Sequence, residues 1–154
     1  MELIELNSRV NIDQNKKLNN SYSHFGKLLN ELNKKELSTE IIISINSGIE
    51  EINSFAESDK KLRKKIKETQ SGIIKLIEKE LKLVTLNHYR NTWMAIGVGA
   101  FGVPIGVVLG TSLGNMGYIG LGMPMGMFIG LAIGSGMDKK AFDEERQLDL
   151  EIKY

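Results

Sequence analysis

Residues with types and spacings suited to catalysis are scarce in this chain of 154 residues. The absence of cysteine excludes disulfides, thiolate chemistry and the commonest structural zinc sites. The two histidines, His24 and His88, belong to no carboxylate–histidine motif, and we expect both to be ordinary side chains. The stretch "GVGAFG" (97–102) matches G-x-G-x-x-G in form, but its apolar context and the lack of a following soluble helix exclude dinucleotide binding. We therefore predict no catalytic residue, no cofactor, no metal and no enzyme.

A second kind of chemistry, ion passage, would need polar side chains inside an apolar segment. Residues 91–137 hold no Asp, Glu, Lys or Arg, so no intramembrane charge marks an ion path there. The residues that could line a pore, besides glycine backbone, are Thr111, Ser112, Asn115 and Ser135. A pore is therefore possible only with a sparse lining, or with a hydrophobic constriction that gates by dewetting.

The elements that must position these residues lie in that uncharged block of 47 residues, which holds 13 of the 16 glycines. Trp93 to Leu113 and Tyr118 to Met137 are each long enough for one membrane-spanning helix, which needs ~20 residues. The short stretch 114–120, "GNMGYIG", is rich in turn formers, so we predict an antiparallel helical hairpin. Tyr89, Trp93 and Tyr118 are the predicted interface anchors.

The flanks of the block carry lysine and arginine, whereas the turn carries none. The positive-inside rule then predicts a multi-pass protein of the inner (cytoplasmic) membrane with both termini in the cytoplasm. The charge of the whole chain is only +1, which gives little electrostatic support for a nucleic-acid partner. The predicted partner is the lipid bilayer.

The block also repeats itself, because a shift of 20 residues superposes its glycines and prolines. Glycines four apart lie on one helix face and permit close backbone approach. The predicted helix-packing residues are Gly102, Gly106, Gly110, Gly114, Gly122, Gly126, Gly130 and Gly134. Two arrangements fit them, a hairpin closed within one chain and association between chains. We favour a homo-oligomer, because one hairpin would not readily cover both glycine faces.

Proline occurs once in each copy of the repeat. Pro104 lies well inside the first span, where it breaks the bond to the carbonyl of Ala100, and we expect a bend there. Pro124 lies near the predicted start of the second span, where a missing N–H costs little. Both are treated as candidate helix kinks, serving either gating or packing.

Residues 1–90 differ in texture, with no proline and with apolar residues three and four apart. We expect one helix through residues 18–32 and another from an N-cap at Ser38 or Thr39. The stretch 57–65 favours a turn capped by Ser58 or Asp59. From Leu62 to Leu83 the apolar positions approximate a coiled-coil seam: Leu62, Ile66, Thr69, Ile73, Leu76 and Leu83. The basic run 60–68, "KKLRKKIKE", is read as a solvated face, or as a surface that meets anionic lipid.

The predicted fold class is all-α, a membrane protein in three parts. These are a soluble helical bundle or coiled-coil domain (1–90), a glycine-zipper transmembrane hairpin (91–137) and a charged cytoplasmic tail (138–154). The duplicated run Gly-x-Pro-x-Gly-x-x-x-Gly-x-x-x-Gly resembles the glycine-zipper transmembrane hairpins of small bacterial proteins, over about residues 94–136. The resemblance implies homo-oligomeric packing and, in some members, membrane pores. Two functions follow as hypotheses: a membrane-anchored scaffold with a cytoplasmic protein partner, or an oligomeric pore gated by the helical domain.

Overall fold

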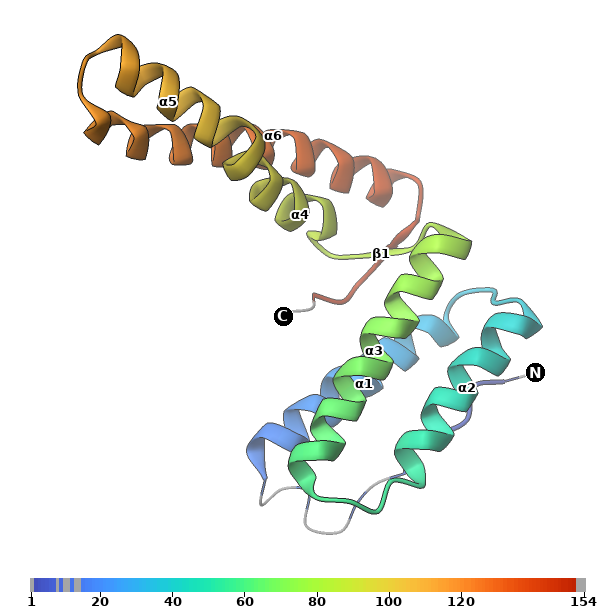
Figure 1. Ribbon diagram of the computed structural model, residues 1–154. Coiled ribbons are helices and arrows are strands. Elements are labelled where there is room, and N and C mark those ends of the chain that lie inside the picture. The colour runs from blue at the N-terminus through green and yellow to red at the C-terminus, as the bar shows by residue number, and fades with distance from the viewer. Residues whose placement is uncertain (1, 8, 10–11, 13–14, 152–154) are drawn as a thin grey trace. The chain divides into compact units, whose positions relative to one another are not determined.

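The computed structural model describes residues 2–7, 9, 12 and 15–151, and it is mostly helical (Figure 1). Its contacts divide the chain into two compact units. Unit 1 comprises residues 1–84 and 148–154, and unit 2 comprises residues 85–147. The short strands β1 (Val84–Thr85) and β2 (Gln147–Leu148) pair as a two-stranded sheet. This division differs from the predicted one at two places. The first boundary lies near residue 85, and the charged stretch 138–154 is divided between the two units and does not form a separate tail. Residues 152–154 of that stretch lie outside the described part.

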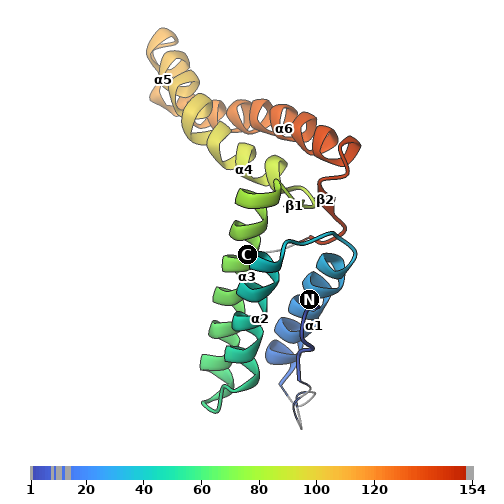
Figure 2. The ribbon, with the colours of Figure 1, turned by 90° about the vertical axis from the view of Figure 1, so that its right-hand side faces the viewer.

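Unit 1 is a three-helix bundle of α1 (Lys16–Asn33), α2 (Thr39–Asn53) and α3 (Asp59–Leu81), which lie side by side in Figures 1 and 2. The side chain of Ser38 accepts a hydrogen bond from the N–H of Ile41 (3.4 Å), which confirms the predicted N-cap of α2. The predicted break between the two helices is confirmed, but it lies at residues 54–58. Residues 59–65 of the stretch predicted as a turn are helical, because α3 begins at Asp59 after an N-cap position at Ser58 that makes no side-chain cap bond. Helices α2 and α3 are therefore separate.

The buried stripe of α3 differs from the predicted seam. Its buried residues are Leu62, Ile66, Gln70, Ile73, Ile74 and Ile77, whereas Thr69 and Leu76 are only partly buried. The helix ends at Leu81, and Lys82 follows with a positive φ of 57°, so Leu83 lies beyond the helix. Of the two alternatives, the single chain forms the helical bundle: α3 packs against both α1 and α2, which requires a wider apolar stripe than a two-stranded seam.

Both ends of the described chain take part in the core of unit 1. Leu148 is fully buried and Leu150 nearly so, within a cluster that includes Phe25, Leu28 and Ile45. Beside them the N–H of Asp149 donates to the Glu31 carboxylate (3.2 Å). The hydrogen bond from the ammonium of Lys34 is the main reason that the pKa of Glu31 is lowered, and the Asp149 N–H adds to it. Because Leu148 and Leu150 lie in the core, the chain's last described residues are part of the bundle.

Unit 2 is a helical hairpin. Its first arm consists of α4 (His88–Gly97), the π-helix η2 (Val98–Gly102) and α5 (Val103–Ser112). The turn contains the 3-10 helix η3 (Met116–Tyr118), and the second arm is α6 (Ile119–Asp143). By length and composition the helical stretches His88–Ser112 (25 residues) and Met116–Asp143 (28 residues) could each cross a membrane.

A candidate helix-packing site in the apolar hairpin

The interface between the two arms of the hairpin is built from glycine. The buried residues of the first arm are all glycines, and those of α6 are glycines followed by one aspartate and one alanine. The buried set is Gly97, Gly102, Gly106, Gly110, Gly122, Gly126, Gly130, Gly134, Asp138 and Ala141. Since each arm turns its glycine face to the other, the interface is formed largely by bare backbone.

The approach is too close for any other residue type. A Cβ placed on Gly126 would lie 2.6 Å from the Cα of Gly102, and one placed on Gly134 would lie 2.5 Å from the Cα of Arg90. Real Cβ atoms essentially never come within 3.0 Å of another heavy atom, and here the opposing atoms are backbone. Glycine Cα–H groups and carbonyl oxygens from the two arms therefore meet directly, as in tightly packed membrane helices.

Seven of the eight predicted packing glycines lie in this interface, and Gly114 does not. Gly114 is exposed and has a positive φ of 66°, so it supports the turn instead of the packing. The expectation that one hairpin would not cover both glycine faces is wrong, because the two faces cover each other. The expectation assumed that each glycine face would receive large side chains from a neighbouring helix. In the structure the backbone of one glycine face packs directly against the backbone of the other.

The sequence reasoning missed Gly97, which lies five residues before Gly102 and so breaks the four-residue register. The π-helix η2 explains the spacing. Its wider turn, in which the N–H of Val103 donates to the carbonyl of Val98, absorbs one extra residue and returns Gly97 to the packing face. The stretch 97–102 that resembles a nucleotide motif is thus accounted for by helix packing.

The two prolines lie in different surroundings. Pro104 lies in the first turn of α5, directly after η2, where the N–H of the preceding Val103 donates five residues back to the carbonyl of Val98. The bend at Pro104 stays a prediction, and η2 gives it a local cause. Pro124 lies inside α6 and not at its start, because the helix already begins at Ile119. Its ring removes the bond that an N–H would make to the carbonyl of Gly120.

Asp138 closes the open end of the interface, a role that the sequence reasoning did not assign to it. It continues the four-residue register of Gly130 and Gly134 and is 9 % exposed. Its carboxylate oxygens accept hydrogen bonds from the N–H groups of Tyr89 (3.0 Å) and Arg90 (2.9 Å). Asn87, the N-cap residue of α4, makes no side-chain cap bond, so Asp138 caps α4 from the opposite arm. An aspartate one step beyond a glycine register was the signal available in the sequence.

We expect Asp138→Asn to weaken the pairing of α4 with α6 by about 0.5–2 kcal/mol, the range for losing a helix cap. The amide keeps one acceptor oxygen, but its NH₂ group would face a backbone N–H that also donates. Amide hydrogen exchange in detergent micelles should show faster exchange at Tyr89 and Arg90. Asp143→Asn, at the exposed last residue of α6, serves as the control. Equal exchange in both variants would contradict the capping role.

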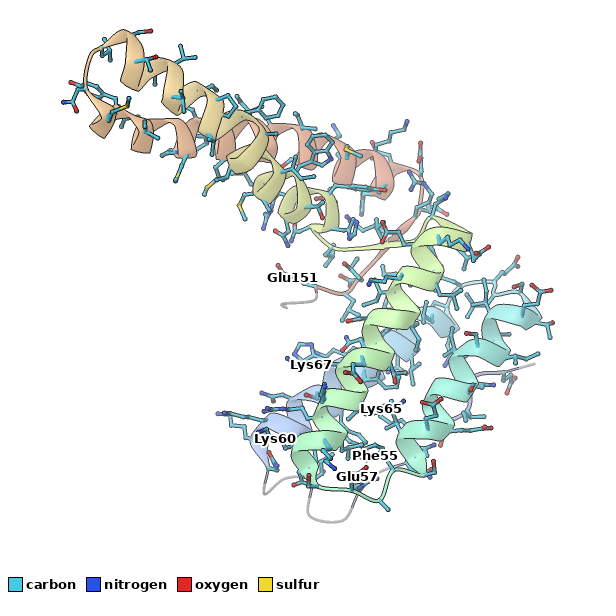
Figure 3. All side chains as sticks on the ribbon, in the orientation of Figure 1. Phe55, Glu57, Lys60, Lys65, Lys67 and Glu151 are labelled. Atoms are coloured by element: carbon cyan, nitrogen blue, oxygen red, sulfur yellow. The ribbon has the colours of Figure 1, made fainter. Side chains whose placement is uncertain are left out.

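The outer surface of the hairpin is apolar. Figure 3 shows side chains projecting outward all along its arms. Phe128 is 71 % and Val108 is 62 % exposed, and further large apolar side chains are exposed on both arms. Of the predicted interface anchors, Tyr89 and Trp93 are half-buried and Tyr118 is exposed. The hairpin therefore buries glycine and exposes large apolar side chains, the reverse of the pattern in a water-soluble helix pair.

The four predicted pore-lining residues lie at the two ends of the hairpin. The Thr111 hydroxyl donates within its own helix, with the carbonyls of Val107 (2.9 Å) and Val108 (3.1 Å) in reach, and the Asn115 side chain accepts from the N–H of Gly117 (2.8 Å). Ser112 is also near the turn, whereas Ser135 lies near the other end of α6. All four are exposed, but the structure brings Ser135 to none of the others.

Within residues 2–7, 9, 12 and 15–151 there is no cluster of three or more His, Asp or Glu side chains that could hold a metal ion. Comparisons of the chain with protein-family models, with curated proteins and with solved structures find no match.

Proposed function

We propose that this chain is a membrane-anchored scaffold: the hairpin inserts into a bilayer as a closed unit, and the helical bundle presents an interaction surface on the cytoplasmic side. The observation that carries the proposal is the hairpin's inverted packing. Glycine backbone fills the interface, and side chains such as Phe128 and Val108 face outward. In water this exposure of apolar surface would be unfavourable, whereas lipid tails would cover it.

The extent of burial supports the same proposal. Only 22 % of the most apolar part of His88–Ser112 and 17 % of that of Met116–Asp143 is buried within the structure. A core helix of a soluble protein is mostly buried. Both arms are helical along their length, so most of their backbone polar groups are bonded within the helices, and Asp138 accepts from the N–H groups of Tyr89 and Arg90 at the start of α4. That arrangement meets the main requirement for crossing a bilayer.

Self-assembly into a homo-oligomer belongs to the proposal, but it would use a surface other than the glycine faces. Those faces are covered by each other, so neighbouring hairpins would pack through outward side chains, including the methionines Met123, Met125 and Met127. Methionine adapts to irregular surfaces, which suits packing between hairpins or against lipid.

Dye release from liposomes that carry the purified protein separates the scaffold from a pore. We expect the vesicles to retain a small dye, because the middle of the hairpin offers no polar side chain to a water path. Mass measurement in mild detergent should show a species larger than one chain. Leakage that Gly110→Leu or Gly130→Leu abolishes would favour the pore instead, and a strictly monomeric mass would contradict self-assembly.

A further inference from the structure

The N-terminal segment Glu2–Asn7 is held along α2 by two asparagine side chains. The amide of Asn46 accepts from the N–H of Ile4 (3.0 Å) and donates to the carbonyl of Glu2 (3.1 Å). The amide of Asn53 accepts from the N–H of Asn7 (2.9 Å) and donates to the carbonyl of Glu5 (3.0 Å). Each amide therefore binds the two main-chain groups on either side of one residue, Leu3 or Leu6. We call the pair the asparagine rail.

The spacing of the rail matches that of an extended chain. Asn46 and Asn53 are seven residues apart, a helical rise of ~10.5 Å. The residues that they flank are three apart, ~10 Å in an extended chain. A further three residues along, the guanidinium of Arg9 donates to the carbonyl of Phe55, which Figure 3 labels just beyond the end of α2. The contacts thus repeat along the segment with a period of three residues.

The site selects for an apolar, extended occupant but places few other demands on it. Leu3, Ile4 and Leu6 pack partly buried against the core, and a hollow beside them is lined by Gly26, Leu29, Asn30 and Asn33 of α1. All four rail bonds go to main-chain atoms, which any extended segment offers. With the segment in place Asn46 is only 8 % exposed, so the segment shields this amide and its two hydrogen bonds from water.

We propose that the asparagine rail is an exchangeable docking site, and that its occupant in trans is the N-terminal segment of a second copy of this chain. The segment's fit is shown by its contacts in cis, and a second copy would make the same contacts. Exchange therefore sacrifices no interaction and is governed by local concentration and by the linking residues. The step to a second copy rests on the proposed self-assembly, which brings copies together, whereas the docking site itself does not.

The docking site is tested by anisotropy with a labelled peptide of sequence MELIELNSR in mild detergent. A chain lacking residues 2–7 should bind it saturably, and Asn46→Ala with Asn53→Ala should weaken this by about tenfold or more. Asn20→Ala, at an exposed position of α1, is the matched control. Absence of saturable binding with unchanged helical circular dichroism, or indifference to the paired substitution, would overturn the docking site.

A full-length variant keeps the test valid if the deletion fails to fold. Ile4→Pro removes the N–H that donates to Asn46, so the chain's own segment competes less and the peptide should bind about tenfold more tightly than to the wild type. Glu5→Pro removes an N–H outside the rail bonds and should bind the peptide as the wild type does. Equal affinity of the two proline variants would count against the site.

Exchange between copies is tested by energy transfer in this cysteine-free chain. Chains with a donor dye at Glu2→Cys are mixed with chains carrying an acceptor at Ser47→Cys, on the exposed side of α2. We expect transfer that Asn46→Ala with Asn53→Ala in the acceptor chain reduces severalfold. Transfer that the substitutions leave unchanged would overturn exchange but leave self-assembly standing, whereas a monomeric mass would overturn self-assembly as well.

Discussion

A leucine at Gly130 should open the hairpin. A Cβ at this position would lie 2.7 Å from the carbonyl carbon of Trp93, and the opposing atoms are backbone that has no rotamer to change. Overpacking usually costs about 1–3 kcal/mol and occasionally more, and a rigid backbone partner places this site at the upper end. The two arms must then separate along their length, because neighbouring glycines depend on the same close approach. We expect the loss of arm pairing to be nearly complete.

The measurement uses two dyes on one chain, at Thr92→Cys and Ser135→Cys, which are exposed positions on opposite arms. Energy transfer between them should fall strongly with Gly130→Leu. Gly136→Leu is the matched control, because nothing lies within 4 Å of a Cβ on Gly136 in the same helix. A hairpin that stays closed with leucine at Gly130, or opens equally with leucine at Gly136, would contradict the packing described above.

In the bundle, Ile45→Ala should destabilise unit 1 by about 2–5 kcal/mol. Ile45 is fully buried on α2 within the cluster that holds Phe25 and Leu28, so truncation leaves a cavity. Small domains have a total stability of about 5–15 kcal/mol, and such a loss brings the unit close to unfolding. Urea unfolding followed by circular dichroism in detergent measures the change.

Ile43→Ala is the control for that substitution, since Ile43 is the same residue type two positions earlier on α2 and is 52 % exposed. Its effect should stay within about 0.5 kcal/mol. Similar losses in both variants would mean that the buried stripe of α2 is not the one described.

Much of this fold could be predicted from the sequence, because the helical signals are local. The apolar spacing of α1, the N-cap at Ser38 and the four-residue glycine register each involve residues less than two turns apart. The register also identified seven glycines of the packing site. What it did not specify was the partner of each glycine face, since the same register suits a neighbour from the same chain or from another.

The features that were missed depend on contacts distant in sequence. Asp138 caps α4 across 48 residues, and Asn46 holds a segment 42 residues away, so neither role leaves a local pattern. Leu148 and Leu150 joined the core although the charged stretch around them predicted a tail. The π turn at 98–102 was not predicted, because the five-residue spacing of Gly97 and Gly102 does not fit the four-residue register of the other packing glycines.

The central claim, that the hairpin crosses a bilayer with its turn on the far side, is tested most directly by labelling a single cysteine in the turn. The turn is labelled at Asn115→Cys or Met116→Cys, and the bundle at Ser47→Cys, in separate single-cysteine variants in intact cells. All three positions are exposed. An impermeant thiol reagent applied from outside should label the turn and leave the bundle unlabelled until the cells are lysed. A turn that is labelled only after lysis would contradict the account.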